Sequence, residues 1–126
     1  MKISEIVKRE KDNKDIVLHK EGLFWRAYEY SAYCFVTNIK SYNVLHKFYK
    51  NIGQDIVYIG FPGSYYDKIV DLCKQKNHTL KKVNDKQIII KGIPEPIGFD
   101  EWKSETRAVR DFRIPNQIST GFEILT

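Results

Sequence analysis

Residues 15–28 read DIVLHKEGLFWRAY, and this stretch decides the fold. Its first part, Asp15 to Lys20, is a short β-branched and apolar run, which predicts a strand. Glu21-Gly22 is typical of a tight turn, and Leu23 to Tyr28 resumes as a second strand rich in aromatic residues. The stretch therefore predicts a β-hairpin.

Apolar residues recur at helical spacing on both sides of this hairpin, in residues 3–13 and again in residues 29–39. Strand-like composition follows in residues 44–49 and 55–61, joined through a turn at Asn51-Ile-Gly53. The hairpin is therefore expected to belong to a domain that mixes helices with a sheet.

The next segment, Phe61-Pro62-Gly63-Ser64, ends a strand and begins a helix, with Ser64 as the expected N-cap. Apolar residues follow at positions 66, 69, 70 and 73, the spacing of one helix face. Residues 78–83 and 86–91 flank Asn84-Asp85, which predicts a closing hairpin.

Residues 1–92 therefore predict one α/β domain with a mixed sheet of about six strands and about three helices. After Gly92 the composition changes, and residues 93–126 are expected to form a C-terminal extension. Residues 93–96 predict a stiff linker, and residues 100–112 predict one more helix, which Pro115 ends. Residues 118–126 predict either a short strand or a partly disordered tail.

Charge and aromatic content favour an anionic partner. The 126-residue chain has a formal net charge of +5, and aromatic residues make up 13% of it. Residues from Ile93 onward contain four basic and six acidic side chains, so residues 1–92 hold 17 basic and 10 acidic side chains. The basic surface is therefore expected on the first domain, where surplus aromatic rings would serve as contacts.

Neither metal, cofactor nor catalytic site is expected. His19, His46 and His78 fall in three different predicted strands without the spacing of metal ligands. Cys34 and Cys73 fit neither a disulfide framework nor a metal knuckle and are expected to be buried, reduced thiols. The N-terminus lacks the apolar region of a signal peptide, and no apolar run is long enough to cross a bilayer, which predicts a cytoplasmic protein without a membrane partner.

Two local motifs are similar to the N-terminal, mismatch-recognising domain of the MutS DNA-repair proteins. The segment Gly22-Leu-Phe-Trp-Arg-Ala-Tyr28 stands where that family typically has Gly-Asp-Phe-Tyr-Glu followed by an apolar and an aromatic residue. Ile59-Gly-Phe-Pro62 stands where the family has a Gly-x-Pro segment before a helix. The predicted order of elements over residues 2–92 also resembles that domain.

The resemblance implies that Phe24 occupies the position of an aromatic wedge, which inserts beside a mispaired base. Arg26 stands where the family has a glutamate that hydrogen-bonds the base. A guanidinium cannot accept a hydrogen bond from a base N–H but can pair with phosphate or with guanine acceptors. With arginine at position 26, mismatch discrimination by the family's mechanism is not expected, whereas general binding to nucleic acid still is.

The chain has no Gly-x-x-x-x-Gly-Lys phosphate loop, so the ATPase of full-length MutS proteins is not expected. Small freestanding MutS-like proteins accompany reverse transcriptases in bacterial diversity-generating retroelements, and the size and charge of this chain are similar. The resemblance thus implies a non-enzymatic accessory protein that binds DNA or an RNA–DNA hybrid with low selectivity, beside a reverse transcriptase or another protein. The residues expected to contact nucleic acid are Phe24, Arg26, Lys40, Lys47, Tyr49 and Lys50.

Simpler interpretations stay open at this stage. Phe24 and Trp25 alternate in a strand, so one ring is expected in the core and the other outside. Arg26 and the lysines around residue 47 also suit a solvated strand edge without any partner. Two other functions remain: an adaptor that docks proteins through its aromatic residues and the region of Trp102, or a small nuclease whose carboxylates come together on folding.

Overall fold

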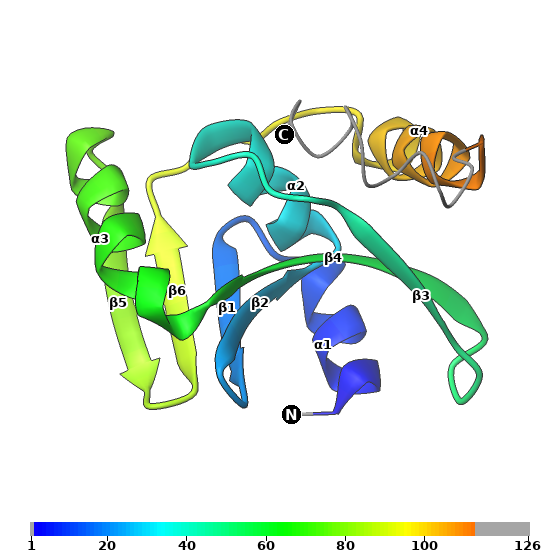
Figure 1. The fold of residues 1–126 in the computed structure, drawn as a ribbon, viewed down its shortest axis with the longest axis horizontal. Coiled ribbons are helices and arrows are strands. Elements are labelled where there is room, and N and C mark those ends of the chain that lie inside the picture. Colours follow the sequence, from blue (N-terminus) through cyan, green and yellow to red (C-terminus); the bar gives the residue numbers. More distant parts are fainter. Residues whose placement is uncertain (1, 113–126) are drawn as a thin grey trace.

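The computed structural model describes residues 2–112, with side-chain surroundings for residues 2–106. These residues contain four α-helices, one 3₁₀ turn and six strands, and the strands follow one another in pairs between the helices (Figure 1). The helical elements are α1 (Ile3–Glu10), α2 (Tyr30–Asn38), η1 (Gly63–Tyr65), α3 (Tyr66–Gln75) and α4 (Phe99–Phe112). The strands are β1 (Ile16–Glu21), β2 (Phe24–Tyr28), β3 (Leu45–Tyr49), β4 (Gln54–Pro62), β5 (Thr79–Asn84) and β6 (Gln87–Lys91).

The six strands form one sheet in the order β3-β4-β2-β1-β6-β5, so the α/β class and the number of strands are as predicted. The sheet was expected to be mixed, but β1–β2, β1–β6, β2–β4, β3–β4 and β5–β6 all pair antiparallel. The order in which the chain adds its strands explains why all pairs are antiparallel. β2 and β3 run in the same direction on either side of α2, but β4 inserts between them, so no two parallel strands become neighbours.

The β1–β2 hairpin lies at the centre of this sheet. Glu21 and Phe24 are register partners, which leaves a two-residue loop of Gly22 and Leu23. Gly22 has φ +60° at the first loop position, a conformation that glycine adopts without steric cost and that matches the twist of a hairpin. The hairpin predicted from residues 15–28 is therefore confirmed.

Two apolar clusters lie on opposite faces of the sheet. The larger cluster packs under α2 and α3 and includes Trp25, Phe35 and Phe61. The smaller cluster lies under α1 and includes Tyr28 and Ile56. α1 has eight residues and covers only part of this face. Tyr49 and Tyr58 are half-buried against its cluster, whereas Phe24 of β2 and Lys47 of β3 remain exposed.

Phe24 and Trp25 point to opposite faces of the sheet. Trp25 points to the α2–α3 face and is buried, stacking on Tyr66 with ring centroids 5.8 Å apart. Phe24 points to the opposite face and is 45% exposed. The ring that occupies the predicted wedge position is therefore the exposed one.

The helix expected over residues 100–112 is α4, which lies beside α2 (Figure 1). Trp102 stacks on Tyr33 of α2 with centroids 4.7 Å apart, and Ile93 in the preceding segment reaches the larger core cluster. Pro115 and the predicted element at 118–126 lie outside the described residues. Among the described helices, none combines the length and apolar character needed to cross a membrane.

Ser64 does not cap the helix that follows it. Residues Gly63–Tyr65 form a 3₁₀ turn, and α3 begins only at Tyr66 without a side-chain cap. Gly63 is held against the hairpin instead, since its N–H donates to the Leu23 carbonyl at 2.8 Å. The Gly-x-Pro corner thus lies directly beside the β1–β2 loop.

Candidate nucleic-acid interface

The uncovered surface beside α1 holds most of the predicted contact residues. We define the open face as Phe24 and Arg26 of β2, Lys47 and Tyr49 of β3, and Tyr58 of β4. The register places these residues on one side of the sheet, because residues directly opposite on neighbouring strands share a face. Strand pairing thus brings together side chains that are up to 34 residues apart in the chain.

Arg26 lies flat along the open face. Its guanidinium carbon is 5.2 Å from the centre of the Tyr58 ring, within the range of a cation–π contact. Its register partner on β4 is Gly60, where a Cβ atom would come within 3.3 Å of the Arg26 Cγ. The absence of a side chain at Gly60 therefore leaves room for the arginine to lie across the strand.

Glu21 is the acidic neighbour of Arg26. One carboxylate oxygen lies 3.4 Å from the Arg26 Nη1, and the other accepts a hydrogen bond from the Tyr28 hydroxyl. Burial, followed by the bond to Glu21, raises the pKa of Tyr28, so the hydroxyl remains a donor. The Arg26 and Glu21 side chains are both more than a third exposed, and such pairs contribute about 0–1 kcal/mol. Separating Arg26 from Glu21 therefore costs little, but a phosphate that paired with Arg26 would be repelled by the nearby Glu21 carboxylate.

A second cation and ring lie on β3. The Lys47 ammonium is 4.9 Å from the centre of the Tyr49 ring, and Lys47 is exposed. Burial raises the pKa of Tyr49, which keeps that ring neutral. Cations with adjacent rings can pair with phosphates and stack on bases, the two contributions that dominate nucleic-acid binding.

The structure does not bring all six predicted residues together. Lys50 is exposed in the turn after β3, at the far end of the open face. Lys40 follows α2, and its ammonium lies 5.5 Å from the centre of the Tyr42 ring. Tyr42 stacks on Phe35 and Phe61 in the larger core cluster, so Lys40 lies on the α2–α3 side, away from the open face.

Tyr58 and Glu21 were not predicted as contacts. Tyr58 falls in a predicted strand. It becomes a candidate contact only because the Arg26 side chain on β2 extends over its ring on the neighbouring strand β4. Glu21 was assigned to a turn, whereas it ends β1 and faces the side chains of β2. Alternation along the strand predicts that Phe24 and Arg26 share a face, as they do, but the register between β2 and β4 is not readable from one sequence.

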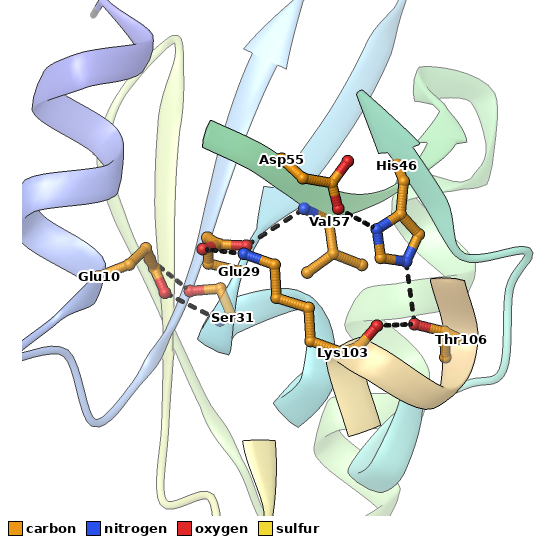
Figure 2. Close-up of polar contacts among 8 residues, drawn as sticks. All are labelled: Glu10, Glu29, Ser31, His46, Asp55, Val57, Lys103 and Thr106. Carbon is orange, nitrogen blue, oxygen red and sulfur yellow. Dashed lines mark hydrogen bonds and ion pairs between the residues drawn. The ribbon is translucent and has the colours of Figure 1, made fainter. Parts of the chain in front are cut away.

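A buried polar network joins α1, α2, β3, β4 and α4 (Figure 2). Glu10 accepts hydrogen bonds from the Ser31 N–H at 2.8 Å and the Ser31 hydroxyl at 2.7 Å. Burial raises the pKa of Glu10 to about 7, although its hydrogen bonds to Ser31 and Asn13 act in the opposite direction. Glu10 thus links α1 to the start of α2.

Glu29 links the sheet to α4. Its backbone has φ +52°, which is rare for residues other than glycine. Its carboxylate accepts a hydrogen bond from the Val57 N–H at 3.1 Å. The second carboxylate oxygen lies 2.8 Å from the Lys103 Nζ (Figure 2). Both side chains are largely buried, so each charge compensates the other for the loss of hydrating water.

The third part of the network is centred on His46. Its Nδ1 lies 2.6 Å from an Asp55 carboxylate oxygen, and its Nε2 lies 3.0 Å from the Thr106 Oγ1 (Figure 2). Thr106 also donates to the Lys103 carbonyl within α4. Because each polar group here has a neighbour across an element boundary, the arrangement suits anchoring of α4 on the β3–β4 hairpin.

The remaining reactive side chains lie in the core. Cys34 and Cys73 are free and buried, and burial raises the pKa of Cys34 to about 12, so its thiolate is not populated at neutral pH. Within residues 2–106, no three His, Cys, Asp or Glu side chains are arranged to hold a metal ion.

No protein-family model matches this chain, and no curated protein or solved structure matches it either. The resemblance to the MutS N-terminal domain therefore rests on the residues quoted above.

Proposed function

We propose that this protein is a non-enzymatic, MutS-like nucleic-acid-binding protein whose open face contacts DNA or an RNA–DNA hybrid. The observation that supports this most strongly is that the exposed Phe24 and Lys47 and the half-buried Arg26 lie on one side of the sheet, beside the rings of Tyr49 and Tyr58. Phe24 is 45% exposed, so much of its ring is free for contact with a partner.

The proposed binding is driven by the backbone and is weakly selective. Arg26 and Lys47 would pair with phosphates, which carry no sequence information. Phe24 would stack on an exposed base or wedge at a weakened step, since an apolar ring replaces part of the lost stacking. With arginine at position 26, mismatch selection through a carboxylate at that position is not part of the proposal.

The proposed context is a cytoplasmic accessory role beside a reverse transcriptase. The MutS-like motifs, the small size and the basic first 92 residues support it. In that role the protein would hold a template, product or hybrid strand while another protein performs the chemistry.

Fluorescence anisotropy with labelled duplex DNA and RNA–DNA hybrid at two or more salt concentrations tests the proposal. The double variant Arg26→Ala/Lys47→Ala is expected to bind at least about tenfold more weakly, and the slope of log affinity against log salt is expected to fall by about 2. Lys40→Ala is the matched control, because Lys40 lies on the other side of the sheet. A wild-type affinity weaker than about 10⁻⁴ M for both ligands would rule out the proposed function.

A protein-binding adaptor is the second candidate. Leu23 is 83% exposed and Tyr65 is 41% exposed, and both lie at the corner where Gly63 bonds the hairpin loop beside Phe24. An exposed apolar group of this kind suits a protein contact as well as a base. Leu23→Ser combined with Tyr65→Ser would abolish partner binding and spare nucleic-acid affinity if the adaptor hypothesis holds.

A further inference from the structure

A cavity of about 590 Å³ lies between the end of α1, the start of α2 and the segment that leads into α4. Glu10 and Glu29 line it, and these residues are only 5% and 8% exposed. None of the five open-face residues lines it, so it is a separate site. The volume falls within the range of about 300–1,000 Å³ that is typical of small-molecule sites.

The charge of this cavity is opposite to that of the chain, which is +5 overall. Its described lining contains two basic side chains, Lys11 and Lys14, and Lys14 lies 4.0 Å from Glu95. The same lining contains five carboxylate side chains, which are those of Glu10, Asp12, Glu29, Glu95 and Asp100. The excess of negative charge favours a cationic ligand.

Glu10 is a buried carboxyl group that has no cationic partner in the described part of the chain. It accepts hydrogen bonds from the N–H and hydroxyl of Ser31 and from the Asn13 amide, all of which are neutral. Buried charges in proteins are normally paired with an opposite charge. Here burial, with Glu29 as a minor cause in the same direction, raises the pKa of Glu10 to about 7. A cation bound beside Glu10 would supply the missing opposite charge.

Two aromatic rings line the same cavity. Tyr30 and Phe99 have ring centroids 6.2 Å apart and an angle of 74° between their planes, so they form two walls of a corner. The Lys103 ammonium lies 6.0 Å from the centre of the Phe99 ring and 2.8 Å from Glu29. One ammonium is therefore already held here between a ring and a carboxylate. Such rings favour an organic cation.

We propose that this cavity binds a linear aliphatic polyamine. One ammonium group pairs with Glu10, and a second pairs with an exposed carboxylate such as Asp100. The methylene chain between them packs against the rings of Tyr30 and Phe99. The bound polyamine thus links α1 to the segment that leads into α4. This inference does not depend on the proposed function, because the cavity shares no side chain with the open face.

Isothermal titration calorimetry of the nucleic-acid-free protein with spermidine tests this proposal. Spermidine is expected to bind at least about tenfold more tightly than butylamine, which has a similar chain but a single ammonium, at matched ionic strength. Near neutral pH the Glu10 carboxyl is partly protonated, and a cation beside it favours the ionised form. The observed heat is therefore expected to differ between phosphate and HEPES buffers, since binding releases a proton.

Glu10→Gln is expected to weaken spermidine binding at least about tenfold, the effect of losing a hydrogen bond to a charged group, and to remove the buffer dependence. Asp100→Asn changes an exposed side chain without risk to the fold and is expected to weaken binding by up to about fivefold. The matched control is Asp71→Asn, at an exposed position of α3 outside the cavity lining.

Three results would overturn the polyamine proposal and leave the proposed function untouched. They are an absence of saturable spermidine binding, equal affinity for spermidine and butylamine, and equal affinity of the wild type and Glu10→Gln for spermidine. An equal loss of affinity in Asp71→Asn and Asp100→Asn would also overturn it, because general attraction to a negative surface would then explain the binding.

Discussion

Phe24 is an exposed ring on a strand whose next residue, Trp25, is buried in the core. Burial of apolar surface stabilises a fold in proportion to the area removed from water, so the ring of Phe24 contributes less to stability than that of Trp25. Its neighbours on the open face are Arg26 and, across the strand pair, Glu21. At the scale of single residues, Phe24 is therefore the side chain whose removal best separates binding from folding.

Phe24→Ala is expected to weaken binding to nucleic acid by about 1–3 kcal/mol, the usual contribution of one stacked ring, while the free energy of unfolding falls by less than about 1 kcal/mol. Anisotropy titration and urea denaturation measure the two effects. Phe48→Ala is the matched control, since Phe48 is 58% exposed on the opposite face of β3. Equal loss of affinity in both variants would contradict a contact specific to the open face.

Glu10 makes stability depend on pH. Its folded-state pKa of about 7 lies above the ordinary value of 4.5, so the folded protein binds this proton more tightly than the unfolded chain does. The resulting stabilisation is fully present below about pH 4.5 and is lost as the pH rises to about 7. The shift corresponds to a change of about 3 kcal/mol in the free energy of unfolding.

Glu10→Gln is expected to remove this pH dependence, because the amide mimics the protonated carboxyl group. Urea denaturation between pH 4.5 and pH 8 measures it as the difference between wild type and variant. Asp12→Asn, at an exposed position just after α1, serves as the control. A wild type and a Glu10→Gln variant with parallel pH profiles would show that the burial of Glu10 has no such effect.

At the scale of elements, α4 is attached through a few specific contacts. Trp102 stacks on Tyr33, Lys103 pairs with Glu29, and Thr106 hydrogen-bonds His46. Each contact joins α4 to a different element, α2, the β2–α2 junction and β3, respectively. The helix therefore covers the side of the sheet opposite to the open face.

Trp102→Ala is expected to lower the free energy of unfolding by about 2 kcal/mol, less than a fully buried Trp because this ring is half-buried. Hydrogen exchange within α4 is expected to accelerate, and affinity for nucleic acid to stay unchanged. Glu101→Ala, on the exposed side of α4, is the control. Loss of nucleic-acid affinity in Trp102→Ala would place α4 within the interface and require a different binding surface.

The elements differ in how well the sequence predicts them. The β1–β2 hairpin and α3 follow from alternation, a glycine turn and helical spacing, which are local signals. The antiparallel pairing of β4 with β2 is not local, because it depends on where the chain returns after α2. The same non-local register places Tyr58 beside Arg26, and the packing of Tyr42 on the core holds Lys40 on the other side of the sheet. The kinds of residue in the candidate site were therefore predictable from the sequence, but which of them lie together was not.

At the scale of the whole molecule, the two sides of the sheet differ in what covers them. Helices α2, α3 and α4 cover one side and bury most of the core, whereas α1 covers only part of the other (Figure 1). The open face carries two cations, Arg26 and Lys47, beside the exposed ring of Phe24 and the half-buried rings of Tyr49 and Tyr58. This asymmetry is the basis for assigning the open face, rather than the helical side, to nucleic acid.

Amide chemical-shift mapping on titration with a short DNA duplex tests this assignment most directly. The expected result is that shifted amides concentrate in β2, the β3–β4 hairpin and the β1–β2 loop, with residues 24–26 and 47–49 among the largest, and that α3 and α4 stay unperturbed. Shifts that concentrate in α3 or α4, or no shifts at millimolar DNA, would contradict binding through the open face.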